Sequence, residues 1–396
     1  MSEDLNFDVI VVGRGLIASA SARHLALEGR TVGLIGPTEK QNLRSGQVYA
    51  SHYDNTRVQR IVAQNELWTR LNLDSARQWN PLQELTGIDF YRESGCIYVN
   101  TFHDGYLETA PKIADKFGLK MQSIRNREDV GAISPFLYFD QEVEGIYEPH
   151  LAGSINPRKL VEAQLRAFQQ LGGTEVNEIV VDLSRSDGEW HATTSSGERY
   201  SAKQVLVAAG AFSNYFNLLP RKLDIQNKSE VVVMAKVTEA DFLRMRDMPS
   251  LLFEIKVGEF DGIYLIAPTQ TSDGSYILKM GMNQSRDLDL NDEAAMRDWF
   301  TGDAYLTYAS VLERELKKLF PTIHFVELTY KPCVISRTTT ENPYIGEVEE
   351  DLFVAHGCNG YSAMSSDAQG RQATALMLNG RFDEGYNADD FRVIYK

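Results

Sequence analysis

The chain has 396 residues, of which 43% are hydrophobic and 24% are charged. This composition is typical of a soluble globular protein, and the length allows two domains or one large α/β body. The formal net charge of −15 argues against nucleic acid or an anionic membrane surface as a partner. No apolar run is long enough to span a bilayer, and a strand that begins at Phe7 leaves no room for a signal peptide.

The cysteines favour a reducing compartment. There are three of them, Cys96, Cys333 and Cys358, and they are widely spaced. This odd number forms neither a zinc pattern nor a disulfide framework, so we expect no metal site and a cytoplasmic location.

A dinucleotide-binding motif opens the chain. Phe7 to Val12 (FDVIVV) is typical of a buried strand, and Leu16 to Glu28 is typical of a helix that ends at Gly29. The turn between them has the form GxGxxA and aims a helix N-terminus at a pyrophosphate. We assign it five residues: Gly13 for the tight turn, Gly15 for close approach of the phosphates, Ala18 for helix packing, with Leu16 and Ile17 beside them.

The second strand, Thr31 to Ile35, departs from that motif. An acidic residue is expected at its end to hold the cofactor ribose, and Gly36 stands there instead. Either Glu39 reaches back to the ribose or the ribose is held in another way.

Further along the chain, several segments have clear periodicity. Two are helical: Val58 to Gln78, and the helix that Asn156 and Pro157 begin before Gly172-Gly173 ends it. We also expect a largely helical region over 291–320. Strands are expected over 88–100, 176–183, 191–194, 231–237, 263–267 and 275–281.

Two later segments point to the same dinucleotide site. The buried strand Gln204 to Gly210 (QVLVAAG) is expected beside the first strand, so that a cofactor lies across both. The small-residue-rich helix from Tyr361 to Asn379 follows a glycine-rich turn and offers a second helix dipole to the cofactor.

Separate stretches now carry a resemblance to a known family. They are GRGLIASASARHLA, SHYDNTRVQR, GIYEPHLAGSINPRKLVEA, VLVAAGAFSN, KPCVISRTTTENPYIG and HGCNGYSAMSSDAQG, in this order and spacing. Together they resemble the FAD-dependent D-amino acid oxidase superfamily, most closely its sarcosine oxidase branch, over essentially the whole chain.

The resemblance implies an α/β fold with two domains. A Rossmann-like FAD-binding domain of the glutathione-reductase type would comprise residues 1–80, 148–217 and 331–396. A substrate-binding domain with a large mixed β-sheet would comprise residues 81–147 and 218–330. The implied activity is oxidation of the C–N bond of a small secondary amine, amino acid or cyclic imino acid to an imine, with O2 reduced to H2O2.

The resemblance also implies catalytic residues. Arg60, expected on a helix that starts near Arg57, matches an arginine that pairs with the substrate carboxylate. The alternative from periodicity is that these two arginines form a solvated helix face. His52 and Arg57 match positions near the flavin ring, and a structural role for His52 stays open.

Two residues of the expected sheet match active-site positions. Lys279, among apolar neighbours in YILKMG, matches a lysine that promotes reaction with oxygen, where a cation would stabilise developing superoxide. The alternative is an exposed edge lysine. Tyr264 matches an active-site tyrosine, or is a core or surface residue.

Cys333 matches the cysteine that carries FAD through a thioether in the sarcosine oxidase branch. The alternative is a free cysteine that packs as a small hydrophobe; Cys96 and Cys358 are expected to have no such role. Val180 matches a branched residue beside the adenine, or is a core valine. The other cofactor residues that the resemblance implies are Ser51, Ala209, Gly210, Gly357, Asn359, Gly360 and Tyr361.

Three positions depart from the sarcosine oxidase pattern. Ala363 replaces a lysine that helps to bind the carboxylate, Ile335 replaces a tyrosine, and Asn283 replaces a histidine. The substrate half of the site is therefore altered, and a substrate larger or less polar than sarcosine is expected.

Three alternatives to an oxidase stay open. The first is a flavin dehydrogenase of an amine or 2-hydroxy acid that passes electrons to a quinone or protein. The second is a flavin-binding partner or maturation protein. The third is a nicotinamide enzyme, which the flavin-type stretches disfavour.

Overall fold

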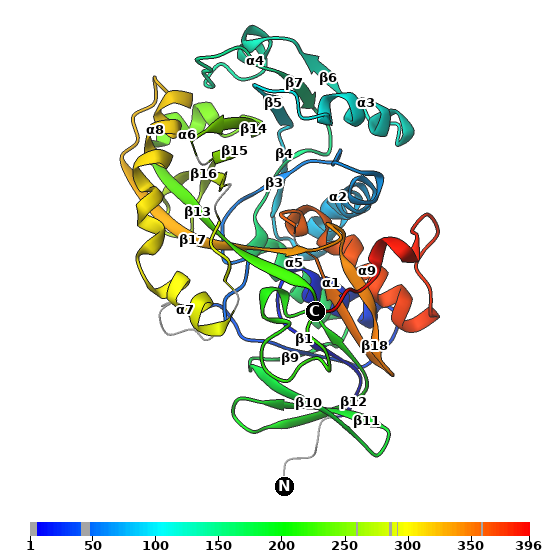
Figure 1. The fold of residues 1–396 in the computed structure, drawn as a ribbon. Helices are drawn as coiled ribbons and strands as arrows, with labels where there is room; N and C mark the ends of the chain where they lie inside the picture. Colours follow the sequence, from blue (N-terminus) through cyan, green and yellow to red (C-terminus); the bar gives the residue numbers. More distant parts are fainter. Residues whose placement is uncertain (1–5, 41–47, 259, 285–286, 291, 358) are drawn as a thin grey trace.

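The computed structural model describes residues 6–396 except 41–47, 259, 285–286, 291 and 358 (Figure 1). Within these residues the chain forms two eight-stranded sheets and a small three-stranded sheet. Helices cover the sheets, so the architecture is the mixed α/β class that the sequence predicts.

The first sheet contains the N-terminal strand at its centre. β1 (Asn6–Val12) pairs in parallel with β2 (Val32–Ile35) on one side and with β12 (Arg199–Val207) on the other. The strand predicted over 204–210 therefore lies where the sequence placed it. The remaining strands are β9 (Thr174–Val176), β10 (Val180–Ser186), β11 (Glu189–Thr194), β18 (Tyr344–Glu349) and β19 (Leu352–His356).

Four helices pack together beside this sheet (Figure 1). They are α1 (Leu16–Leu27), α2 (Glu66–Thr86), α5 (Pro157–Gln170) and α9 (Ser362–Asn379). The small residues of α9 let it approach α1 closely: a Cβ on Gly370 would lie 2.7 Å from the backbone nitrogen of Ser21. Buried Asp367 of α9 pairs with Arg23 of α1 at 2.6 Å, which ties the two ends of the chain together.

The second sheet has one apolar and one mixed face. Val231 and Val233 of β13 (Ile225–Val237) belong to a core with the outer helices, whereas Glu230 and Val232 point the other way. The other strands, in spatial order around β13, are β17 (Glu327–Thr338), β16 (Tyr276–Gln284), β15 (Phe260–Gln270), β14 (Ser250–Val257), β5 (Cys96–Asn100), β7 (Glu144–Glu148) and β6 (Gln122–Ile124).

Further helices accompany this sheet, and three of them contact its apolar face: α6 (Glu239–Met245), α7 (Glu293–Thr301) and α8 (Ala309–Leu319). The others are α3 (Tyr106–Lys116) and α4 (Arg127–Ile133). The 3-10 turns are η2 (Gly210–Phe212), η3 (Ala304–Tyr308) and η4 (Ala388–Phe391). The third sheet, in the order β3 (Arg57–Gln59), β8 (Gly153–Ile155) and β4 (Tyr91–Glu93), lies between the two large ones (Figure 1).

One helix prediction is wrong in part. Residues 57–59 form a strand because they pair with β8, and the helix begins only at Glu66, where the Asn65 side chain accepts a hydrogen bond from the backbone of Trp68. The described residues of the 291–320 region are largely helical, as predicted, with a break at Gly302 and the 3-10 turn η3 between α7 and α8. The division into two domains at the boundaries given above stays a proposal, and β17, which crosses one boundary, pairs with β13 of the second sheet.

Candidate active site

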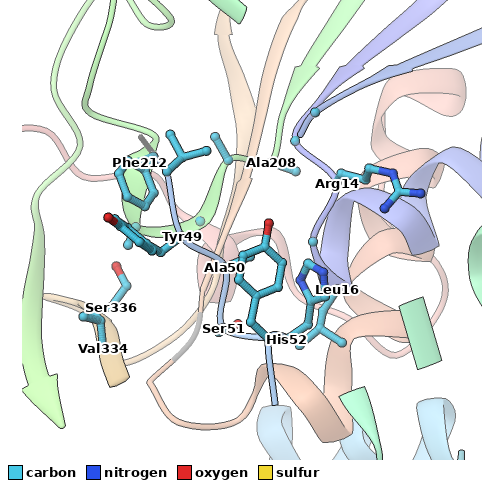
Figure 2. A pocket seen from close by; sticks show the side chains of 18 of the residues that line it. Arg14, Leu16, Tyr49, Ala50, Ser51, His52, Ala208, Phe212, Val334 and Ser336 are labelled. Atoms are coloured by element: carbon cyan, nitrogen blue, oxygen red, sulfur yellow. The ribbon is translucent and has the colours of Figure 1, made fainter. Parts of the chain in front are cut away.

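A cavity of about 400 Å³ lies where the carboxyl ends of β1 and β12 face the second sheet. Its walls come from the GxGxxA turn, residues 48–54, the residues after β12, and parts of β13, β17 and β19. Figure 2 shows this arrangement, with Leu16 and His52 on one side and Tyr49 and Phe212 on another. The cavity follows the carboxyl edge of a parallel sheet, where α/β proteins bind nucleotide ligands.

The GxGxxA turn has the geometry that the motif requires. Gly13 has a φ of +119°, and a Cβ there would lie 2.5 Å from the carbonyl oxygen of Ala208, so only glycine fits. At Gly15 the nearest atom to a Cβ is His52 Nδ1, 4.0 Å away. No side chain caps α1, so its first backbone N–H groups remain available to an anion.

Gly36 has a steric explanation. A Cβ at this position would lie 2.7 Å from the backbone nitrogen of Arg14 and 2.7 Å from the carbonyl carbon of Gly13. The turn therefore occupies the space in which an acidic side chain would stand. Glu39 also lines the cavity, where Arg158 donates two hydrogen bonds of 2.7 and 2.6 Å to its carboxylate. Glu39 is therefore an acidic side chain close to Gly36, where the ribose-binding acid was expected.

Two buried histidines leave nitrogen atoms without partners at the cavity wall. His52 Nδ1 and His356 Nδ1 have no hydrogen-bond partner among the described residues. Burial lowers the pKa of His52 to about 3 and that of His356 to about 4, so both are neutral at pH 7. Each therefore presents a neutral imidazole nitrogen that a ligand can satisfy.

Most of the predicted cofactor residues lie together at this cavity. Twelve line it: Gly13, Gly15, Leu16, Ile17, Ser51, His52, Arg57, Val180, Ala209, Gly210, Cys333 and Gly357. Ala18 is buried within the helix core, which is the packing role given to it. Asn359, Gly360 and Tyr361 do not line the cavity, and Cys358 lies outside the described residues.

Asn359 has a structural role in this arrangement. Its side chain accepts a hydrogen bond from the Thr338 backbone at 2.9 Å, and its backbone donates to Ser336 at 3.0 Å. It therefore fixes the glycine-rich turn to β17. Ser362, the first residue of α9, lines the cavity, so a second helix N-terminus borders it as predicted.

Sequence reasoning missed several residues that line the cavity. Arg14, Tyr49, Arg158, Phe212 and His356 belong to this set. Two of them had a local signal: Arg14 stands between the two glycines of the GxGxxA turn, and His356 ends a buried strand directly before the glycine-rich turn. Tyr49, Arg158 and Phe212 come from other segments, whose distance from the GxGxxA turn depends on the tertiary fold.

Cys333 lies on the cavity side of β17 and is half-buried. Its sulfur accepts a hydrogen bond of 3.5 Å from Arg57, whose guanidinium also lies 3.2 Å from the Asp54 carboxylate. Arg57 thus brings a positive charge to the cavity wall.

Lys279 is fully buried and does not line the cavity. Its ammonium forms an ion pair with Asp54, which does line the cavity, and donates to the carbonyl of Thr56 at 3.2 Å. Burial and the nearby Arg57 lower the pKa of Lys279, and Asp54 opposes this shift. The sequence alternative of an exposed edge lysine is therefore wrong.

Arg60 lies directly after β3 and not on a helix, so the expected helix face of Arg57 and Arg60 does not exist. The Arg60 side chain is buried, and it donates to the hydroxyls of Tyr106 at 3.2 Å and Tyr361 at 3.0 Å. Arg60 Nε has no partner among the described residues. The nearby Glu148 carboxylate accepts instead from the backbone of residues 61 and 62.

Tyr264 is half-buried on β15, and its ring lies over Gly281 of β16. A Cβ on Gly281 would lie 2.1 Å from Cζ of this ring, so the tyrosine needs a glycine beneath it. Lys279 Nζ lies 5.5 Å from the ring centroid. Tyr264 and Lys279 are therefore neighbours, although neither lines the cavity.

The three departures from the sarcosine oxidase pattern lie on different elements. Asn283 is half-buried on β16, Ile335 is half-buried on β17 two residues beyond Cys333, and Ala363 is buried in α9.

In the part of the chain that the structure describes, we find no cluster of histidine, cysteine or acidic side chains suited to a metal. No described helix has the length and apolarity needed to cross a membrane.

Comparison with known proteins identifies the family to which the chain belongs. Residues 8–376 match the family model of the DAO family, described as FAD dependent oxidoreductase. The chain belongs to this family, and its cofactor is FAD. A bound dinucleotide is consistent with the unpartnered histidine nitrogens, with the two helix N-termini at the cavity and with Gly13 and Gly15 of the GxGxxA turn.

Individual relatives are distant. The chain is 23% identical over 210 residues to N-methyl-L-tryptophan oxidase of Yersinia pestis, an alignment that covers 52% of this chain and 54% of that protein. The match thus spans about half the length of this curated relative.

Two solved structures share the fold over nearly the whole chain. One is NikD, described as an unusual amino acid oxidase essential for nikkomycin biosynthesis, with a TM-score of 0.78, 20% identity, and coverage of 99% and 98% of the two chains. The other is L-proline dehydrogenase from P. horikoshii, with a TM-score of 0.75, 20% identity, and coverage of 97% and 96%.

Proposed function

We propose that this protein oxidises the C–N bond of a small secondary amine, amino acid or cyclic imino acid that carries a carboxylate, giving an imine. The observation that carries the proposal is the Arg60 guanidinium, which is buried beside two tyrosine hydroxyls without a carboxylate bound to it. The nearby Glu148 carboxylate stabilises the charge of Arg60, but Arg60 Nε has no partner among the described residues, and a guanidinium fork fits a carboxylate. Arg60 is three residues from Arg57, which lines the FAD cavity.

The amine class is supported by the names of the similar proteins, which act on N-methyl-L-tryptophan, an amino acid and L-proline. Flavin, when bound, accepts a hydride equivalent from the substrate. The protein's residues would hold the substrate: Arg60 binds the carboxylate, and Tyr264 borders the reacting end. The hydroxyl of Tyr361 positions the guanidinium of Arg60 by accepting its hydrogen bond.

Covalent attachment of FAD at Cys333 is part of this proposal. Its support is the position of the sulfur at the cavity wall, 3.5 Å from the Arg57 guanidinium. Acid-denatured protein run on a gel under ultraviolet light tests it. We expect a fluorescent band at the mass of the protein that is lost in Cys333→Ala, and free FAD from the wild type would contradict it.

We further propose O2 as the electron acceptor and H2O2 as a product, with the protein in the cytoplasm. The position of Lys279 supports O2 as the acceptor, because its side chain pairs with Asp54, which lines the cavity, and a cation near the flavin can stabilise developing superoxide. The alternative is a dehydrogenase with another acceptor. It is favoured by the same ion pair, because Asp54 neutralises the charge that oxygen activation needs.

Anaerobic and aerobic experiments distinguish an oxidase from a dehydrogenase. Purified holoprotein would be mixed under argon with sarcosine, N-methyl-L-tryptophan, L-proline and L-pipecolate, and the flavin absorbance recorded. Bleaching by an amine followed by rapid recovery and peroxide formation in air supports an oxidase. Bleaching with recovery only after a quinone is added supports a dehydrogenase, and no bleaching by any amine contradicts the proposed function.

A further inference from the structure

Glu230 is a buried carboxyl group that the proposed function leaves unused. It lies on β13 directly opposite Cys333 of β17, and its side chain shares the sheet face of Val232, which lines the cavity. Its residue is 1% exposed, and its Oε1 atom has no hydrogen-bond partner among the described residues. An orphaned carboxylate oxygen at this depth calls for an explanation, because burying it is costly.

The Glu230 carboxyl hydrogen-bonds the hydroxyl of Tyr264, which crosses from β15 over Gly281 of β16. The absence of a side chain on Gly281 is what lets the ring reach across the intervening strand. Tyr264 is half-buried, and its ring over Gly281 lies on the sheet face that Glu230 shares. A hydroxyl that donates to a carboxylate retains a lone pair with which it can accept from a third group.

The charged groups around Glu230 come from several elements. Arg57 of β3 and Lys279 of β16 stabilise its anionic form, and Asp287, which follows β16, opposes it. Tyr264 of β15 and Cys333 of β17 complete the surroundings. Burial raises the pKa of Glu230 to about 8, with Asp287 acting in the same direction. A carboxyl group of this kind exchanges a proton near neutral pH.

We propose that Glu230 is a positioning residue that accepts the proton of the substrate ammonium through the Tyr264 hydroxyl. One N–H bond of the ammonium breaks as the proton passes to Tyr264 Oη, and the proton of that hydroxyl passes to Glu230. The products are a neutral amine with a free lone pair, a neutral tyrosine and a carboxylic acid. No electrons are transferred in this step, and Glu230 returns its proton to water after the product leaves.

This inference rests on the proposed function, and the experiment distinguishes the two. The limiting rate of anaerobic flavin reduction by the best amine of the panel would be measured from pH 6 to 10 in wild type and Glu230→Gln. We expect an ionisation near pH 8 in the wild type that is absent in the variant. The variant should be about 10²-fold slower near pH 8, where a large fraction of Glu230 is ionised, and approach the wild type at high pH, where free amine is abundant.

Glu315→Gln is the matched control, because Glu315 is a buried carboxylate of α8, on the other side of the sheet. It should keep the wild-type profile. Superimposable profiles of wild type and Glu230→Gln overturn the inference alone. If no amine reduces the wild-type flavin, the proposed function fails and the inference fails with it.

Tyr264→Phe and Glu230→Asp keep the inference testable if Glu230→Gln does not retain flavin. Tyr264→Phe should lose the same ionisation, whereas Glu230→Asp should keep it at a reduced rate. An unchanged profile in Tyr264→Phe overturns the inference. Infrared difference spectra of the holoprotein provide a readout without substrate. The carboxylic acid signal that disappears from wild type between pH 7 and 9 should be smaller in Glu230→Gln, where Glu254 is the remaining contributor, and an unchanged signal overturns the assignment.

Discussion

Lys279 and Asp54 form an ion pair between the second sheet and the segment that precedes β3. Lys279 is fully buried, and Asp54 lines the cavity. Burial by itself would raise the pKa of Asp54, but Lys279 and Arg57 hold it below its ordinary value. Asp54 therefore stays ionised at neutral pH and brings its negative charge to the cavity wall, with Lys279 buried behind it.

Replacing Lys279 by methionine should separate the two half-reactions. We expect reoxidation of reduced flavin by O2 to slow about 10²-fold, since a buried positive charge is lost, while anaerobic reduction by the amine changes little. Stopped-flow absorbance measures both steps. Lys112→Met, at an exposed position of α3, is the control, and equal loss in both half-reactions would show that Lys279 acts mainly on the structure.

Arg60→Gln should weaken binding of carboxylate-bearing amines. Loss of a charge-assisted hydrogen bond to a buried carboxylate costs about 2–5 kcal/mol, so we expect Kd to rise by at least about 30-fold. An amine without a carboxylate should be affected much less. Flavin spectral titrations give both values, and Arg92→Gln on β4, which is partly exposed, serves as control. A similar rise for both amine types would contradict the carboxylate role.

Gly281→Ala should displace Tyr264, because the new methyl group would lie 2.1 Å from the ring carbon. The expected result is slower flavin reduction by the amine with normal flavin content. Gly131→Ala on α4 is the matched control, since no atom lies within 4 Å of a Cβ there. Rapid-reaction rates of the two variants would be compared, and identical rates would exclude a role for the position of Tyr264.

Gly36→Asp should lower the FAD content of purified protein, although an acid at this position would restore the familiar ribose ligand. Its Cβ would lie 2.7 Å from the backbone of the GxGxxA turn, so the turn must move. Gly36→Ala should act in the same direction. Flavin-to-protein absorbance ratios measure the effect, and full FAD content in Gly36→Asp would show that the turn adapts.

Asp367→Asn should destabilise the protein by about 3–5 kcal/mol at pH 7, because buried Arg23 loses its partner. Burial opposes ionisation of Asp367, but His24 and Arg23 hold its pKa below the usual range. A lowered folded pKa contributes stability above the unfolded pKa of about 4 that is lost as pH falls. Urea unfolding should therefore show the difference between wild type and variant shrinking below about pH 4, and a constant difference would contradict the ion pair.

The sequence predicts local features of this protein better than remote ones. The GxGxxA turn was predictable because its strand, glycines and helix are contiguous and each carries its own signal. The local pattern around Arg57 predicts a helix, whereas the structure has the strand β3 there. Its partner β8 lies about a hundred residues away in the sequence, so no local pattern reveals the pairing.

The surroundings of the predicted catalytic residues depend on tertiary contacts. The resemblance singled out Lys279 and Arg60, but the pairing of Lys279 with Asp54 and the two tyrosines around Arg60 had no sequence signal. Glu230 had none either, because a single acid in an apolar strand is not distinctive until the register places it opposite Cys333.

The close packing of α1 against α9 has a consequence for assembly. The N-terminus of α1 borders the cavity, and the other side of this helix is covered by α9, residues 362–379. The α1 residues that α9 covers include small apolar side chains and Arg23, which pairs with Asp367. A chain interrupted before Ser362 would expose that surface and lack one wall of the cavity. We therefore expect that a chain shortened before Ser362 does not retain flavin, because the wall of the cavity nearest the end of the chain is the last to be synthesised.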